Sequence, residues 1–199
     1  MAHVKVARRS MQEPEWIEIR RVRLERRIVN SRIPVSNWRI RHARQVSECE
    51  YEYEDSGFQP LSVGDTMFTP DGTIFLEADA VVPDELNGQP VWLELQTAAE
   101  MMVQCCGKWV GGLDPNRERV LLEEHARSGE KLEIRIEGYN RSKPDDERDI
   151  KRSGLRGCRQ VFQGAALVTV DSMVQAGLWD VQVLEDTMNC SDVREEIRE

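Results

Sequence analysis

The sequence has no long hydrophobic run. Apolar residues make up 40% of the chain, but they are interspersed with charged residues that make up 32%. No stretch approaches the roughly 18 consecutive apolar residues that a membrane-spanning helix needs. The opening MAHVKVARR lacks the apolar core of a secretory signal peptide. We therefore expect a soluble, cytoplasmic protein with no membrane partner.

Paired metal-binding side chains are also missing. There are five cysteines, an odd number, and none forms a C-x-x-C pair; they are Cys49, Cys105, Cys106, Cys158 and Cys190. In a strand, adjacent cysteines point to opposite faces and cannot share a tetrahedral metal site. The three histidines, His3, His42 and His125, have no second histidine or nucleophile at motif spacing. We predict reduced thiols, no metal site and no catalytic residue in this chain.

No glycine-rich phosphate loop follows a strand and opens a helix, which argues against a nucleotide-dependent enzyme. The net charge is −9, although residues 1–50 carry twelve Lys and Arg against six Asp and Glu. The arginines in this basic segment alternate with Glu18 and Glu25, so they resemble a solvated helix face or a subunit contact. A phosphate-binding surface would need a denser basic cluster, and we predict no nucleic-acid partner.

Residues 141–154, RSKPDDERDIKRSG, concentrate carboxylates, which could in principle pair as the acid and base of a glycosidase. These carboxylates are adjacent and surrounded by cations, whereas a general acid needs a raised pKa. We interpret the segment as a mixed-charge surface loop.

The hydrophobic period changes twice along the chain. Residues 14–30 have the spacing of a helix, and they lie in a predicted N-terminal basic helix and linker at 1–35. Short runs separated by turn signals, among them TIFLEADAVV, MMVQCC and KLEIRIEGY, then predict a mainly β domain at 36–163, an antiparallel β-sandwich of the jelly-roll, galactose-binding-like type. The run ECEYEYED alternates strictly, which predicts Cys49, Tyr51 and Tyr53 on one face of a strand. From residue 164 an apolar stripe at steps of three and four predicts a long C-terminal helix within a helical segment at 164–199. The stripe consists of Leu167, Val170, Val174, Gly177, Val181, Leu184 and Met188, and is widened by Leu178 and Trp179. Because the pattern stops without a helix-end signal, we expect the parent protein to be longer.

One short segment, CCGKWVGGLDPNRERVLLEE from Cys105, crowds glycines, a tryptophan and polar side chains together. CGKW predicts a tight hairpin turn in which Gly107 adopts a positive φ. GGLDPN predicts the next loop, with Asp114 and Asn116 stabilising it. Of the five tryptophans, only Trp109 is placed where a ligand could reach it, since exposed tryptophans can stack on sugars.

Taken together, several segments of the chain resemble the non-catalytic N-terminal β-sandwich of glycoside hydrolase family 38, the α-mannosidases. The resemblance spans roughly residues 20–190 and rests on the order and spacing of motifs. The matching positions are Pro83, Gly88, Val91, Trp92, Leu93, Gly107, Lys108, Gly112, Leu113, Asp114, Asn116, Arg117, Gly129, Glu130, Ile136, Glu137 and Tyr139. Upstream, Phe58, Gly64, Asp65, Asp71, Thr73 and Phe75 fit a further motif. At Cys106, Arg117, Phe58, Met67 and Phe75 the aligned residue differs from the one usual in the family, so no sugar contact is carried over from these positions.

The resemblance implies that catalysis belongs to a downstream barrel, where histidine and aspartate side chains hold zinc and an aspartate is the nucleophile. This chain would scaffold that catalytic domain without activity or a cofactor of its own, and the parent enzyme would be a homo-oligomer that cleaves α-mannosides. An alternative is a stand-alone carbohydrate-binding module with its site at Trp109, Asp114, Asn116 and Arg117. A third hypothesis is an oligomerisation module that uses the basic N-terminal helix.

Overall fold

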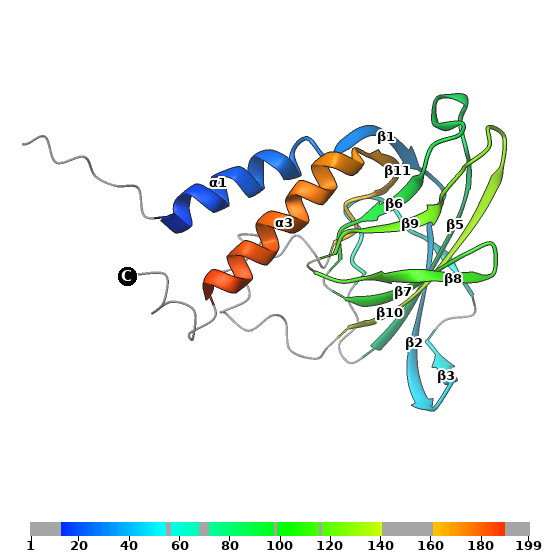
Figure 1. The fold of residues 1–199 in the computed structure, drawn as a ribbon. Coiled ribbons are helices and arrows are strands. Elements are labelled where there is room, and N and C mark those ends of the chain that lie inside the picture. Colours follow the sequence, from blue (N-terminus) through cyan, green and yellow to red (C-terminus); the bar gives the residue numbers. More distant parts are fainter. Residues whose placement is uncertain are drawn as a thin grey trace, which may run out of the picture. The chain divides into compact units, whose positions relative to one another are not determined.

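Strands that alternate buried and exposed residues dominate the structure, a computed structural model that describes residues 13–54, 57–67, 72–97, 99–115, 117–140 and 161–189. The chain divides into two compact units, one of residues 31–169 and one that joins residues 1–30 to residues 170–199. The first unit contains the sheets and the second contains the helices (Figure 1).

The sheets form a sandwich. The smaller sheet has the order β1-β11-β6-β9. Its strands are β1 (Val29–Val35), β6 (Val91–Leu95), β9 (Arg119–Glu123) and β11 (Ala165–Val170). The larger sheet has the order β3-β2-β5-β10-β7-β8, with β4 paired to β2. Its strands are β2 (Arg39–Ser47), β3 (Glu50–Tyr53), β4 (Gln59–Pro60), β5 (Gly72–Val81), β7 (Glu100–Cys105), β8 (Lys108–Leu113) and β10 (Lys131–Asn140). A short 3₁₀ turn, η1 (Asp84–Leu86), precedes β6.

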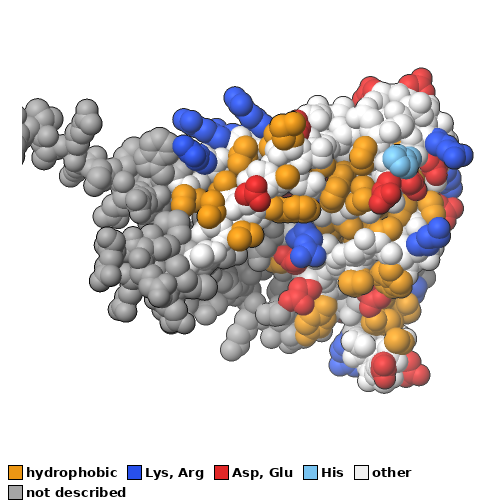
Figure 2. All heavy atoms as spheres, viewed as in Figure 1, with side chains coloured by type: hydrophobic (Ala, Val, Ile, Leu, Met, Phe, Trp, Pro, Cys, Tyr) orange, Lys and Arg blue, Asp and Glu red, His pale blue; other side chains and the backbone are white. Residues whose placement is uncertain are grey.

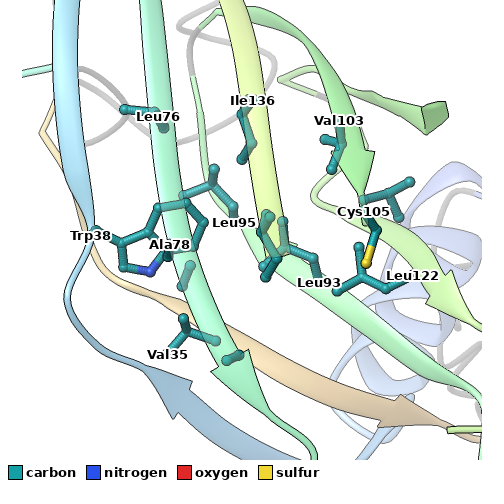
Figure 3. Close-up of a cluster of buried hydrophobic side chains, with 14 of the residues drawn as sticks. Val35, Trp38, Leu76, Ala78, Leu93, Leu95, Val103, Cys105, Leu122 and Ile136 are labelled. Atoms are coloured by element: carbon teal, nitrogen blue, oxygen red, sulfur yellow. The ribbon is translucent and has the colours of Figure 1, made fainter. Parts of the chain in front are cut away.

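The core lies between the two sheets. β5 and β10 pair antiparallel along their whole length, and their even-numbered residues from 74 to 80 and from 132 to 136 point inward and are buried. Leu93 and Leu95 of β6 meet them from the smaller sheet, as Figure 3 shows. Because strand side chains alternate between faces, this inward set fixes which residues form the outer face of each sheet. The predicted mainly β, antiparallel sandwich is confirmed.

The helical unit contains α1 (Glu13–Glu25) and α3 (Ser172–Asn189), which pack against each other. Asp171 caps α3, because its Oδ1 accepts hydrogen bonds from the backbone N–H groups of Met173 and Val174 at 2.9 and 3.0 Å. In the described residues no helix is long and apolar enough to span a membrane.

The sequence-based boundaries of both helices were wrong. α1 ends at Glu25, and Val29–Val35 forms β1 in place of the predicted helix end and linker. The long helix predicted from residue 164 begins only at Ser172, because Ala165–Val170 forms β11. An apolar run buried on both faces of a sheet has the same composition as a buried helix, so periodicity could not separate the two.

The apolar stripe predicted for α3 is also only partly buried. Leu178 is buried, but Trp179 and Leu184, which were assigned to the stripe, are mostly exposed. Figure 2 shows hydrophobic side chains lying along the helices.

Candidate functional site

Trp109 lies near the start of β8, directly after a two-residue hairpin turn. Cys106 and Gly107 occupy the turn with φ of 50° and 76°, and Cys105 pairs with Lys108 across it. Positive φ at both positions is the signature of a type I′ hairpin turn, so the predicted turn is confirmed. The turn holds Trp109 opposite Gln104 of β7.

Trp109 points away from the core. Its partner Gln104 alternates with the buried residues Val103 and Cys105, so Gln104 and Trp109 belong to the outer face of the larger sheet. Trp109 is 55% exposed there. A ligand can therefore reach the indole ring.

The other predicted site residues lie elsewhere. Asp114 and Arg117 face each other across the β8–β9 turn, where the N–H of Asp114 donates to the carbonyl of Arg117 at 3.1 Å and the reverse bond measures 3.0 Å. A regular strand advances about 3.3 Å per residue, so the Cα atoms of Trp109 and Asp114 are at most roughly 16 Å apart along β8, which has a register shift next to Trp109. Asn116 lies outside the described residues. Asp114 and Arg117 thus lie at the other end of β8 from Trp109.

β8 itself was missed by sequence reasoning. Residues 111–113 belong to this strand, although they were interpreted as part of a loop because of their two glycines. A Cβ on Gly111 would lie 2.9 Å from Cγ2 of Val120, and φ of Gly111 is +151°. Here glycine permits a close approach of two strands instead of marking a turn.

Two further exposed side chains share the outer face with Trp109. Met102 of β7 is 50% exposed and Tyr139 of β10 is 44% exposed. Met102 is two residues from Gln104, the partner of Trp109, and it pairs with Glu137, two residues from Tyr139. The sequence contained a signal for both, because the alternation in MMVQCC and KLEIRIEGY assigns them to the polar face. Selecting residues by type alone singles out Trp109 and leaves out Met102 and Tyr139.

The opposite end of the same face is closed by aromatic packing. Tyr51 and Tyr53 of β3 lie on one side of their strand, as predicted, and both contact Phe75 of β5, at ring-centroid distances of 5.0 and 5.8 Å. The guanidinium of Arg41 lies 3.6 Å from the centre of the Tyr53 ring. These rings therefore pack against one another, although Tyr53 is still 43% exposed.

A hydrogen bond ties this cluster to β10. The hydroxyl of Tyr51 donates to Oε1 of Glu137. This hydrogen bond, together with burial and the nearby carboxylate charge, raises the pKa of Tyr51 to about 12. The phenol is therefore protonated, and a donor, throughout the physiological pH range.

Ion pairs cross the middle of the face. Glu77 of β5 is buried and forms ion pairs with Arg39 of β2 and Arg135 of β10. Asp79 pairs with Lys131 at 3.2 Å and with Arg135 at 3.3 Å, and hydrogen bonds from these cations, that of Lys131 first, lower the pKa of Asp79.

The smaller sheet repeats the arrangement. Glu94 of β6 is also buried, with Arg32 at 2.5 Å from Oε1 and Arg119 at 2.9 Å from Oε2. In both places two guanidinium groups engage the two oxygens of one carboxylate. These are structural ion pairs between strands and are not paired acids aimed at a substrate.

The described cysteine and histidine side chains do not form a cluster of three or more that could bind a metal ion. The Sγ atoms of Cys105 and Cys106 are 4.0 Å apart, and burial, followed by the neighbouring thiol, raises the pKa of Cys105 to about 12. Cys105 is therefore not a nucleophile. His125 is exposed and His42 is half-buried in β2. Cys158, Cys190, His3 and the acidic segment 141–154 fall outside the described residues.

The family resemblance implies a zinc ion in a catalytic domain. Within the described ranges no three His, Cys, Asp or Glu residues are grouped so that they could hold a metal ion. The described residues therefore do not provide a zinc site.

Solved structures of a glycosidase share part of the arrangement. β-Glucuronidase from Ruminococcus gnavus in complex with D-glucuronic acid matches with 12% sequence identity and a TM-score of 0.42 over 70% of this chain and 29% of that one. The same enzyme with a C6-substituted uronic isofagomine gives 13% identity and a TM-score of 0.43, over 71% and 30% of the two chains. The chain thus spans less than a third of the length of these structures. At such TM-scores the likeness supports no inference about this protein.

Sequence comparison is more specific. No curated protein is detectably similar to the chain. The family described as "Alpha-mannosidase, jelly roll domain" (Ams1-like) matches residues 32–151, more than half of the sequence. This range begins within β1 and takes in every later strand through β10. The chain belongs to the α-mannosidase jelly roll domain family.

Proposed function

We propose that this chain is the non-catalytic jelly-roll domain of an α-mannosidase and that it supports a catalytic domain which cleaves terminal α-mannose residues. The family match over residues 32–151 carries the proposal. The proposal extends to a zinc-dependent retaining reaction in the catalytic domain, a cytoplasmic location and a homo-oligomeric parent enzyme.

The side-chain contacts favour a structural role over a catalytic one. Glu77 and Glu94, the two buried carboxylates among the described residues of the sandwich, are each held by two arginines from other strands. Removing either carboxylate would leave cations from different strands facing each other without their shared anion. These residues therefore connect strands, which is what a scaffold requires.

Enzyme assay of purified residues 1–199 tests the proposal. We expect no hydrolysis of an aryl α-mannoside, with or without added Zn²⁺, from protein whose far-ultraviolet circular dichroism shows a folded β structure. Zinc-dependent hydrolysis that is lost on chelation and restored by the metal would overturn it.

The genomic sequence downstream of the codon for Glu199 gives a second test. The proposal expects a reading frame that continues into a domain with a His/Asp zinc motif. A stop codon at this position, with no such domain encoded nearby, would contradict the role as part of an α-mannosidase.

A further inference from the structure

Trp109, Met102 and Tyr139 form a diagonal line across three neighbouring strands, which we name the open strip. Each successive pair is offset by one strand and two residues on β7 or β10, and the register of β7 and β8 shifts between Val103 and Gln104. In a regular sheet such diagonal neighbours have Cα atoms about 7–8 Å apart. The whole strip therefore extends roughly 15 Å across β8, β7 and β10. Such a length suits several units of a linear ligand better than a single small molecule.

The strip is not needed to cover the core. Its three side chains are between 44% and 55% exposed, although the strands that carry them bury Met101, Val103 and Ile136 on the opposite face. Gly112 lies opposite Met102 and presents no side chain; a Cβ there would come 3.8 Å from the Met102 sulfur. The missing side chain leaves the outer surface of Met102 accessible.

Polar groups border the strip on the same face. Gln104 lies opposite Trp109, Glu100 lies opposite Tyr139, and Glu137 lies opposite Met102. An amide both donates and accepts hydrogen bonds, and carboxylates accept them from hydroxyl groups. Aromatic rings beside planar polar groups match a ligand with alternating apolar C–H faces and hydroxyl groups, as in a pyranose.

The charged side chains around the open strip indicate which class of ligand it can bind. Glu100 and Glu137 border the strip, and Glu137 also accepts a hydrogen bond from Tyr51; Arg135, which lies opposite Gln104, is paired with Glu77 and Asp79. Two carboxylates would repel a phosphate, a sulfate or a uronic acid, whereas they can accept hydrogen bonds from a neutral polyol. We propose that the open strip binds a neutral oligosaccharide. The structure thus moves the sugar site predicted at Trp109 away from Asp114 and Arg117 and toward Met102 and Tyr139.

Titration calorimetry of the full 199-residue chain with linear α-mannotriose tests the proposal; choosing a mannoside rests on the proposed function. We expect saturable binding that weakens at least about tenfold in Trp109→Ala, because truncating an aromatic anchor removes most of its contact area. Tyr139→Ala should weaken binding as well, while Tyr139→Phe should retain most of it. Trp179→Ala is the matched control, since Trp179 of α3 is 59% exposed but lies in the helical unit. Its binding should equal that of the unmodified chain.

The outcomes separate this proposal from the proposed function. Binding of cellotriose but not of mannotriose would uphold the strip as a sugar site and count against the α-mannosidase assignment. The absence of saturable binding by every neutral oligosaccharide tried, or binding unchanged in folded Trp109→Ala, would overturn the strip. Concentration-dependent association that Trp109→Ala abolishes, seen by sedimentation without sugar binding, would also overturn it and identify the face as a contact between copies.

Discussion

The two ends of the outer face of the larger sheet use aromatic residues in opposite ways. At the β3 end, Tyr51 and Tyr53 pack on Phe75 and the guanidinium of Arg41 lies over the Tyr53 ring, although Tyr53 is 43% exposed. At the β8 end, Trp109 and Tyr139 are about half exposed. One sheet therefore has a closed end, where the rings contact one another, and an open end, where Trp109 is more exposed than any of those rings. Trp109 is thus exposed although aromatic residues elsewhere on the same face pack against one another.

Phe75→Ala should have the largest effect on stability. Phe75 supports both tyrosine rings of the closed end, so its removal should lower the free energy of unfolding by about 2–4 kcal/mol. Denaturant titration followed by circular dichroism measures this loss. Trp109→Ala is the comparison at the open end and should change the unfolding free energy by less than about 1 kcal/mol. Equal losses in the two variants would erase the distinction between the ends.

Glu77→Gln tests the boundary between the two ends. Replacing a buried carboxylate shared by Arg39 and Arg135 should lower the unfolding free energy by about 1–2 kcal/mol, since the half-exposed arginines can regain water. It should also weaken oligosaccharide binding, because Arg135 would lose the partner that holds it beside the strip.

Glu94→Gln is the matched control on the smaller sheet, where Arg32 and Arg119 each pair with one oxygen of the carboxylate. We expect a similar loss of stability and no change in binding. A binding loss equal to that of Glu77→Gln would point to general loosening of the sandwich.

Sequence reasoning recovered the parts of this protein whose signals are local. The alternation in TIFLEADAVV and KLEIRIEGY identified β5 and β10, and the turn at Cys106 and Gly107 was identified by its glycine. β11 was taken for helix because every residue from Ala165 to Thr169 is buried, so no alternation is visible in its sequence. Strand burial on both faces is a property of the tertiary structure and leaves no period to detect.

The candidate site could be predicted only in part, for a related reason. Trp109 stood out by its residue type, but Met102 and Tyr139 lie on other strands, and their proximity depends on the order β10-β7-β8 within the sheet. Asp114 and Arg117 were grouped with Trp109 because they are near it in sequence. An extended strand separates them in space, whereas neighbouring strands bring together residues that are distant in sequence.

Tyr51→Phe should have a smaller effect, about 1 kcal/mol, from the loss of the hydrogen bond to Glu137. The folded-state pKa of Tyr51, about 12, is above the value of 10.0 for a free tyrosine. The stabilisation is therefore fully present below pH 10 and is lost as the pH rises toward 12. The difference in unfolding free energy between Tyr51→Phe and the unmodified chain, measured from pH 7 to 11, should be constant up to pH 10 and then shrink. A difference that grows with pH would contradict the assigned hydrogen bond.

Asp79→Asn should have the smallest effect, below about 0.5 kcal/mol, because Asp79 and its partner Lys131 are both about half exposed and water screens their attraction. The pKa of Asp79 is lowered from 3.8, so its contribution is present above that pH and is lost as the pH falls through the lower folded-state value. Thermal unfolding at pH 7 and at pH 2.5 measures the difference. An Asp79→Asn variant that is less stable than the unmodified chain at pH 2.5 but equally stable at pH 7 would contradict the assigned ion pairs.

The most direct test of the distinction between the two ends compares Trp109→Ala with Phe75→Ala in both stability and mannotriose binding. The account predicts that Trp109→Ala keeps the unfolding midpoint of the unmodified chain and loses binding at least about tenfold. It predicts that Phe75→Ala unfolds at a clearly lower denaturant concentration but, where it remains folded, binds the sugar with nearly unchanged affinity. Loss of stability without loss of binding in Trp109→Ala would contradict the account.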